Sequence, residues 1–328
     1  MTIYSAQSGD WSSTSTWVGG VVPDLYNDDV VIAAGHTVTI QSSDSLTLGS
    51  GRWLSIEASA VLEIYGYLQL DSGSSTSIDG GVYVESGYSL YASGDFTVNS
   101  GGWLDCYGYL DLASGNYATI DGSLYVGYNG NVYVSNSTSL SIYGSLHVDY
   151  NGYLYLNWYA SLYVYGTGTI WGYVYVDYYS YLYVYGLLTV ESGGGLNVTY
   201  SGYVQVESGG LLTLIGWLDV YDSASVYVTY GARVLIERDG GLGISYYASL
   251  TVEGVMAVFG YFSLNYDAYL NVYSEGRMRV YSSVYISGQM YGGGRIDLMR
   301  REARIYDYNG NSLIFCDHAY GFGQTLVA

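Results

Sequence analysis

Apolar and polar residues alternate with a period of two along most of this chain, in short phrases separated by turns. Each phrase starts at a small or glycine residue and continues with Leu or Val, an outward residue, and then Val, Leu or Ile. Clear copies are SLYV at 123–126, NVYV at 131–134, SLYV at 161–164 and YLYV at 181–184. A period of two predicts β-strands rather than helices, with the aliphatic residues on one side of each strand.

The spacing between the phrases predicts how the strands are arranged. Successive phrases begin at Gly122, Gly130, Thr138 and Gly144, in steps of 8, 8 and 6 residues that add to a repeat of 22. A strand phrase that returns at a fixed spacing indicates a solenoid. We therefore predict an all-β fold: a right-handed parallel β-helix with three strands per coil, about 22 residues per coil and about 12 coils.

Glycine and aliphatic residues supply the corners and the interior of this predicted coil. Pairs such as Tyr107-Gly108 and Tyr143-Gly144 mark the short corner, where we expect glycine to provide a positive φ. Inward residues, of which Leu124 is typical, are expected to stack into aliphatic columns and form one continuous core.

The two cysteines lie far apart in this arrangement. Cys106 occupies an inward strand position and is expected to be a buried thiol. Cys316 is 210 positions further on, many coils away, which argues against a disulfide between them. Cysteine content therefore leaves the redox compartment undefined.

The chain divides into three predicted regions: residues 1–35, the repeats at 36–298, and residues 299–328. The first region does not repeat and carries, in order, Trp11, Trp17 followed by Val-Gly-Gly, Pro23, the run DDVVI at 28–32 and the run GHTV at 35–38. This order resembles the opening module of β-solenoid surface and virion proteins encoded by bacteria, archaea and phages. The resemblance implies a capped parallel β-helix in an extracellular or virion protein, with Trp11, Trp17 and Pro23 in the cap. It implies no particular activity.

The charge distribution limits the partners of the chain. The formal net charge is −20, from 29 acidic residues and nine Arg, with no Lys. Residues 1–232 contain one Arg and 20 acidic residues, whereas residues 233–328 contain eight Arg and nine acidic residues. So acidic a surface disfavours nucleic acid and anionic membranes as partners. We expect Arg300, Arg301 and Arg304 to contact the acidic region of a neighbouring copy.

The sequence shows no targeting or membrane-spanning segment. The first 20 residues lack the apolar stretch of a signal peptide, and no apolar run approaches the length of a transmembrane helix. Either a leader is absent from this chain or the protein is released without one, as virion proteins are. We expect an extracellular surface or virion location.

Tyrosine is the main clue to function, with 44 Tyr against five Phe. We expect Tyr133, Tyr155 and Tyr175 to share one outward column, and Tyr163 and Tyr183 to share another, with rings about 5 Å apart. Such columns stabilise a sheet surface, but an aromatic surface this large also marks an interaction face. The predicted face comprises Tyr125, Tyr133, Tyr155, Tyr163, Tyr175, Tyr183, Tyr227 and Tyr285.

Catalytic chemistry finds little support in the sequence. The outward carboxylates are Glu63, Asp105, Asp111 and Asp219. Glu63 and Asp105 are two coils apart, about 10 Å, a loose match to an inverting glycosidase pair. A solvated acidic face explains them better. The three histidines, His36, His147 and His318, are dispersed, and no metal-ligand spacing is present. We predict neither an enzyme nor a bound cofactor.

One further surface type is disfavoured by the expected register. Ice-binding faces need regular threonine arrays, and we do not expect the outward threonines to share one column. These are Thr47, Thr97, Thr119, Thr189, Thr213 and Thr251.

Three functions remain as hypotheses. The first is a self-assembling structural subunit of an extracellular filament, sheath or virion appendage, packing through tyrosine ladders as a homo-oligomer. The second is a glycan-binding adhesin or phage receptor-binding fibre, in which residues such as Tyr155 and Tyr175 contact sugars. The third, disfavoured above, is a polysaccharide-degrading enzyme using Glu63, Asp105 and Asp111.

Overall fold

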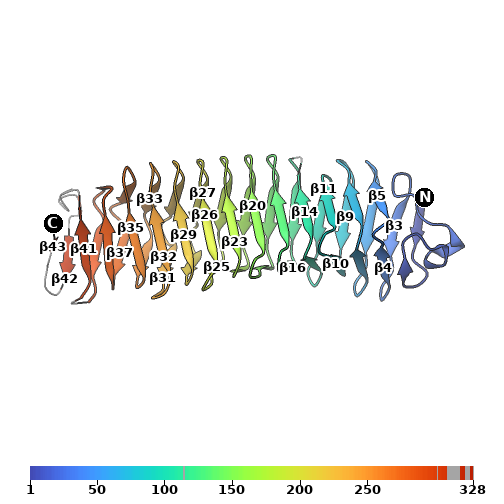
Figure 1. Cartoon of the computed structure of the whole chain (residues 1–328), viewed down its shortest axis with the longest axis horizontal. Coiled ribbons are helices and arrows are strands. Elements are labelled where there is room, and N and C mark those ends of the chain that lie inside the picture. Colours follow the sequence, from blue (N-terminus) through green and yellow to red (C-terminus); the bar gives the residue numbers. More distant parts are fainter. Residues whose placement is uncertain (114, 301, 309–317, 322–325, 328) are drawn as a thin grey trace. The chain divides into compact units, whose positions relative to one another are not determined.

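The computed structural model describes residues 1–113, 115–300, 302–308, 318–321 and 326–327 (Figure 1). Over these residues the chain is all-β, apart from two short 3-10 helices, η1 (Thr14–Thr16) and η2 (Val18–Gly20). The strands are parallel and form a β-solenoid of about 12 turns, which confirms the predicted fold. The chain comprises two compact units, Met1–Leu162 and Tyr163–Ala328, with the division inside strand β21 (Ser161–Val164).

In the first unit, three strand series follow one another around the coil. Series one contains β1 (Thr2–Tyr4), β3 (Asp29–Ile32), β6 (Trp53–Ile56), β9 (Ser75–Ile78), β12 (Asp95–Val98), β15 (Tyr117–Ile120) and β18 (Ser139–Ile142). Series two contains β2 (Gly9–Asp10), β4 (Thr37–Ile40), β7 (Val61–Ile64), β10 (Gly81–Val84), β13 (Trp103–Cys106), β16 (Ser123–Val126) and β19 (Ser145–Val148). Series three contains β5 (Ser45–Leu48), β8 (Tyr67–Leu70), β11 (Ser89–Ala92), β14 (Tyr109–Leu112), β17 (Asn131–Val134) and β20 (Tyr153–Leu156).

The second unit repeats this order of strands. Series one contains β24 (Tyr181–Val184), β27 (Tyr203–Val206), β30 (Ser225–Val228), β33 (Ser249–Val252), β36 (Tyr269–Val272) and β39 (Gln289–Tyr291). Series two contains β22 (Thr167–Ile170), β25 (Leu187–Val190), β28 (Leu211–Leu214), β31 (Arg233–Ile236), β34 (Val255–Val258), β37 (Arg277–Val280), β40 (Arg295–Leu298) and β42 (His318–Gly321). Series three contains β23 (Tyr173–Val176), β26 (Gly195–Val198), β29 (Trp217–Val220), β32 (Gly241–Ile244), β35 (Tyr261–Leu264), β38 (Ser283–Ile286), β41 (Arg304–Asp307) and β43 (Leu326–Val327).

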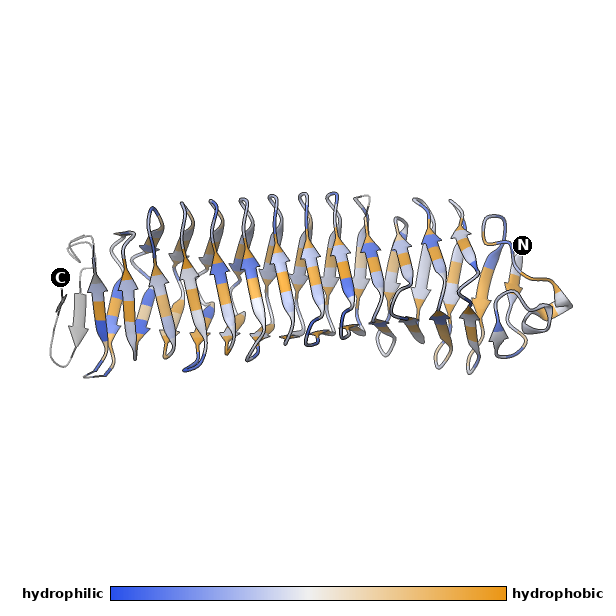
Figure 2. Cartoon of the chain, viewed as in Figure 1, coloured by the Kyte–Doolittle hydropathy of each residue, from blue (hydrophilic) through white to orange (hydrophobic). Residues whose placement is uncertain are grey.

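Alternating burial explains why these phrases form strands. In most strands the second and fourth residues are buried and the first and third face outward, so apolar and polar bands alternate along the ribbons (Figure 2). Leu124, Val126 and their counterparts in other coils are almost fully buried and form the core. The repeat is not rigidly 22 residues, because Val61 pairs with Gly81 at an offset of 20 and Gly81 with Trp103 at 22.

The short Tyr-Gly corners follow a different rule from the one predicted. Gly108 and Gly144 do not have positive φ, so the expected reason for glycine there is wrong. A Cβ at Gly108 would collide with the carbonyl oxygens of Glu85 and Tyr88 in the preceding coil. Glycine is therefore needed at this corner for close stacking of one turn on the next.

Positive φ instead occurs at the longer corners. Gly101 and Gly209 adopt it, as do non-glycine residues such as Asn151. Asparagine tolerates the left-handed region better than most residues because its side chain bonds to the local backbone.

The first 35 residues are integrated into the solenoid. They contribute β1, β2 and β3, which pair in parallel with later strands. Trp11 and Trp17 are buried, with ring centroids 4.7 Å apart in an edge-to-face arrangement, and Pro23 is also buried. The Trp17 indole N–H donates to the Trp11 carbonyl at 2.7 Å. Their role as an end cap stays a prediction, as does the three-region division.

The expectation for Cys106 is confirmed. Its side chain is fully buried, and burial raises the pKa of the thiol to about 12. Cys316 lies outside the described residues.

Candidate interaction surfaces

A ladder of rings covers series two of the first unit. The third-position column from β7 to β19 is Glu63, Tyr83, Asp105, Tyr125 and His147, and we name it, with Tyr65 and Tyr107, the acidic–aromatic face. Ring centroids are separated by 6.4 Å (Tyr65–Tyr83), 5.4 Å (Tyr83–Tyr107), 5.7 Å (Tyr107–Tyr125) and 5.0 Å (Tyr125–His147). Where a carboxylate interrupts the column at Asp105, Tyr107 carries the ladder past it.

Carboxylates lie within this ladder and bond to its hydroxyls. Tyr83 Oη donates to Glu85 Oε2 at 3.0 Å, and Tyr125 Oη donates to Asp149 Oδ2 at 2.6 Å. Burial, followed by these hydrogen bonds, raises the pKa of both phenols. Burial also raises the pKa of Asp105. The face therefore combines ring edges with closely spaced negative charge.

A second ladder follows series three of the first unit. Its centroid separations are 5.3 Å (Tyr67–Tyr91), 5.3 Å (Tyr91–Tyr109), 5.1 Å (Tyr109–Tyr133) and 4.6 Å (Tyr133–Tyr155). Tyr133 and Tyr155 are register partners, so the prediction that they share a column is confirmed. Tyr175, expected in that column, is the third residue of β23 in the second unit.

The second unit carries shorter ladders. Tyr163 and Tyr183 stack at 5.0 Å with nearly parallel rings, which confirms their predicted column. Tyr285 stacks on Tyr306 at 5.2 Å. Tyr227 lies between Gln205 and Thr251 in its column, and its hydrogen bond to Glu253, with burial, raises its pKa to about 12.

Exposed aromatic residues also gather at the four-residue corner between series three and series one. We name as the aromatic corner the residues Trp158 and Tyr159 in the first unit and Tyr178, Tyr179, Tyr200, Tyr246 and Tyr247 in the second. All have positive φ, which is unfavourable for a residue with a bulky side chain. Tyr246 and Tyr247 are 63% and 62% exposed. The chain therefore places aromatic residues where glycine or asparagine would be less strained.

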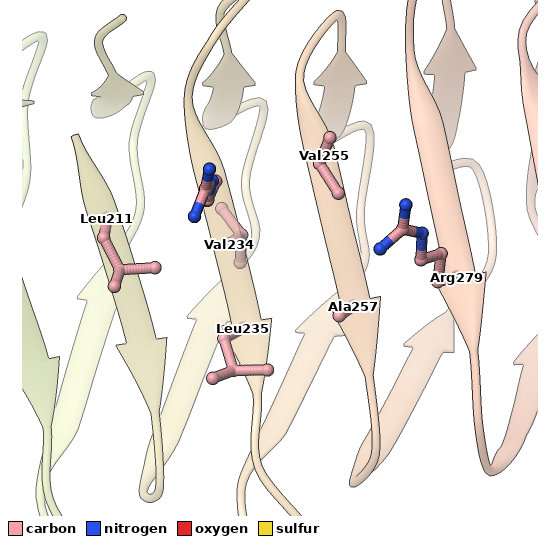
Figure 3. Close-up of a pocket in the computed structure, with 7 residues that line it drawn as sticks. Leu211, Val234, Leu235, Val255, Ala257 and Arg279 are labelled. Carbon is pink, nitrogen blue, oxygen red and sulfur yellow. The ribbon is translucent and has the colours of Figure 1, made fainter. Parts of the chain in front are cut away.

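Series two of the second unit has a different surface, on which outward aliphatic side chains replace the tyrosines (Figure 3). One outward column runs Leu187, Leu211, Arg233, Val255 and Arg277, and the other runs Thr213, Leu235, Ala257, Arg279 and Asp297. We name Leu211, Leu235, Val255 and Ala257, with Arg233 and Arg279, the aliphatic–arginine face. These six residues, with the inward Val234 beneath them, line a depression of about 450 Å³.

The arginines of this region fall into two groups. Arg277 and Arg295 both bond to the buried Asp297, at 2.7 and 2.5 Å. Burial alone would raise the pKa of Asp297, but the two guanidinium groups outweigh it and lower the pKa. Arg233 and Arg279, by contrast, form no ion pair within the described part of the chain, and Arg279 Nε is buried there without a hydrogen-bond partner.

The predicted C-terminal contact residues are only partly described. Arg300 lies over the ring of Tyr281, 5.8 Å from its centroid, and Arg304 begins β41. Arg301 lies outside the described residues. Their contact with a second copy stays a prediction.

The candidate catalytic carboxylates do not form a pair. Glu63 and Asp105 share a column two coils apart, as expected, but Tyr83 lies between them. Asp111 is on β14, in another series, and Asp219 is in the second unit. Within the described ranges, no group of three or more His, Cys, Asp or Glu side chains is arranged to hold a metal ion.

The threonines align more than the sequence suggested. Thr97 pairs with Thr119 in the first unit, and Thr189 with Thr213 in the second. The six threonines nevertheless do not share one column, as expected, because the two pairs lie in different series.

Comparisons with known proteins add little. No protein-family profile and no curated protein matches the chain. Among solved structures, the crystal structure of the TibC-catalyzed hyper-glycosylated TibA55-350 fragment matches over 86% of this chain and 95% of that chain, at 18% identity and a TM-score of 0.29. A likeness this weak transfers no function. Where the chain is described, no helix is long and apolar enough to span a bilayer.

Proposed function

We propose that this protein is a self-assembling structural subunit of an extracellular filament, sheath or virion appendage. In this proposal, the aliphatic–arginine face of one copy packs on the acidic–aromatic face of a second copy. The contact joins two different surfaces, so it is heterologous and repeats from copy to copy, giving a ring if it closes and a filament if it does not.

The observation that carries this proposal is the outward aliphatic cluster. Leu211, Leu235, Val255 and Ala257 occupy positions that hold polar or aromatic residues in most other coils. They contribute little to the core because they face away from it. A contiguous apolar patch bordered by charged residues is typical of a protein interface.

Charge complementarity selects a second copy as the occupant. Arg233 and Arg279 border the patch and form no ion pair among the described residues. Residues 1–232 of every copy supply 20 acidic residues against one Arg. The acidic–aromatic face offers carboxylates beside tyrosine hydroxyls, and arginine forms ion pairs with the carboxylates. The strand spacing along both faces is the same, about 4.8 Å, so contacts repeat in register.

The tyrosine ladders favour this function over glycan binding at Tyr155. The ring of Tyr155 stacks on Tyr133 at 4.6 Å and lies 6.0 Å from Tyr153, so its neighbours cover much of the ring. A sugar ring needs an open aromatic face. The ladders instead present hydroxyl edges, which suit a polar protein contact.

Charge reversal tests the proposal. We expect the double variant R233E/R279E to abolish assembly, measured by negative-stain electron microscopy and by sedimentation across a range of concentrations and salt. Adding E63R/D105R to that variant restores it, because the charges are exchanged. R238E, a reversal at an exposed corner arginine outside the patch, serves as the matched control and assembles normally. A wild-type protein that stays monomeric at high concentration, or R233E/R279E that assembles like wild type, overturns the proposal.

A further inference from the structure

The tyrosine columns of the second unit are interrupted on series three. From β26 to β35 the first outward column is Gly195, Trp217, Gly241 and Tyr261, and the second is Asn197, Asp219, Gly243 and Ser263. Trp217, Tyr261 and the whole second column, with Tyr221, Ser245 and Asn265, line a trough of about 330 Å³. Ring columns elsewhere fill such space, so the trough exists because these four coils carry small and polar residues.

Two aromatic rings border the trough with open surfaces. A Cβ at Gly241 would collide with the indole ring of Trp217, so the absence of a side chain lets this ring lie against the strand. Trp217 is 44% exposed and Tyr261 is 42% exposed. Their centroids are 5.7 Å apart at an interplanar angle of 49°, so neither ring covers the other face to face. Trp217 thus differs from the stacked ladder rings in presenting an open face.

The floor of the trough is polar. The Asp219 carboxylate makes no hydrogen bond or ion pair with any residue that the structure describes, and burial raises its pKa. Asn197 is its register partner on one side and Gly243 on the other. A Cβ at Gly243 would lie 3.0 Å from Asp219 Oδ1 and 3.8 Å from Ser263 Oγ, so glycine keeps the floor open.

We propose that this trough binds a neutral hexopyranose unit of a polysaccharide. The apolar face of a pyranose packs on an open indole, and its hydroxyls donate to a carboxylate and exchange hydrogen bonds with amides. An anionic sugar is excluded by the unpaired charge of Asp219 and by the acidic surroundings. The site is separate from the assembly contact, which uses other strands.

Isothermal titration calorimetry of the full chain with cellopentaose, maltopentaose and α-mannopentaose tests this proposal. We expect at least one of these neutral oligosaccharides to bind, and expect W217A to weaken it at least about tenfold, the value of one lost stacking contact. G243T is the second variant. It fills the trough with a residue that favours strands, so the fold is retained while binding is lost. W171A removes another exposed tryptophan, outside the trough, and is expected to bind within about twofold of wild type.

The outcomes separate cleanly. Binding that W217A and G243T both remove, and that W171A keeps, supports the trough. No binding of any of the three oligosaccharides at millimolar concentration overturns the proposal, as does binding that G243T leaves unchanged. Assembly measured on the same G243T sample distinguishes a failure here from a failure of the proposed self-association.

Discussion

The acidic–aromatic face and the aliphatic–arginine face are made by strands of one design but have opposite chemistry. In both, alternate residues are buried aliphatics, and only the outward residues differ. On the first face, rings contact rings along the column, as in Tyr125 on His147. On the second, Leu235 is followed by Ala257 and then by Arg279, which has a buried nitrogen without a partner. The outward side chains of the first face contact one another, whereas on the second face a guanidinium nitrogen has no hydrogen-bond partner in the part of the chain that the structure describes.

A solenoid surface can stabilise its own sheet or contact a partner, and the two faces differ in which of these they favour. Ring ladders add stability to the sheet that carries them. The half-buried outward leucines beside Arg233 and Arg279 add little, and we propose that they serve a contact with a second copy. Single substitutions on each face test this difference.

The largest effect is expected at Asp297, which borders the aliphatic–arginine face. D297N leaves Arg277 and Arg295 without their shared counter-charge and should lower the free energy of unfolding by about 3 kcal/mol. Because the pKa of Asp297 is lowered in the folded state, its stabilisation is present at neutral pH. The stabilisation is lost as the pH falls below about 4 through the folded pKa.

Urea unfolding at pH 7 and pH 3 measures this effect. The gap between D297N and wild type should shrink in acid, and D239N, at an exposed corner, should show no gap at either pH. A D297N variant as stable as wild type at pH 7 would show that these ion pairs do not stabilise the fold.

A smaller loss is expected in the ring ladder. Y125A removes stacking on His147 and Tyr107 and should lower the free energy of unfolding by about 1–2 kcal/mol. Y125F keeps the stacking and loses only the hydrogen bond to Asp149, so its loss should be about half as large. Equal losses for the two variants would show that the ring contacts contribute nothing.

Asp105 should behave in the opposite sense to Asp297. Burial raises its folded pKa, so the folded state binds the proton more tightly than the unfolded state. Wild-type stability then falls as the pH rises through that pKa. D105N should be slightly more stable than wild type at pH 7, and the two should converge at pH 3. The same urea experiments give the result, and a destabilised D105N at pH 7 would contradict the assigned sign.

The smallest stability effect is expected where the functional effect is large. L235T continues the threonine column from Thr213 and should change the free energy of unfolding by less than about 0.5 kcal/mol. It should nevertheless weaken assembly in sedimentation measurements. A variant that unfolds easily while assembling normally would reverse the interpretation of this face.

The sequence predicted the fold well because buried aliphatics impose the period of two and the coil spacing directly. It misjudged the short corners, since the contact that requires Gly108 comes from carbonyls of another coil and leaves no local trace. It missed the aliphatic–arginine face because an outward Leu235 is indistinguishable by type from the inward Val234 beside it.

The trough was hidden for a related reason. Gly241 and Gly243 look like turn residues in the sequence, whereas both lie within strand β32. Only the register, which aligns them with Trp217 and Asp219, shows that they open a space. Coil lengths vary between 20, 22 and 24 residues. A wrong length assigned to one coil therefore shifts the predicted neighbours of every outward residue that follows it.

The left-handed backbone of the aromatic corner has a practical consequence for finding function without knowing a ligand. Replacing a pair such as Tyr246-Tyr247 by Asn-Gly relieves the unfavourable φ at both positions, so the variant should be harder to unfold than the natural chain. In a library of variants of this protein selected only for thermal stability, the aromatic residues at these positions would then be the first to be replaced. Positions at which the most stable residue differs from the natural residue would then identify the side chains that were selected for function.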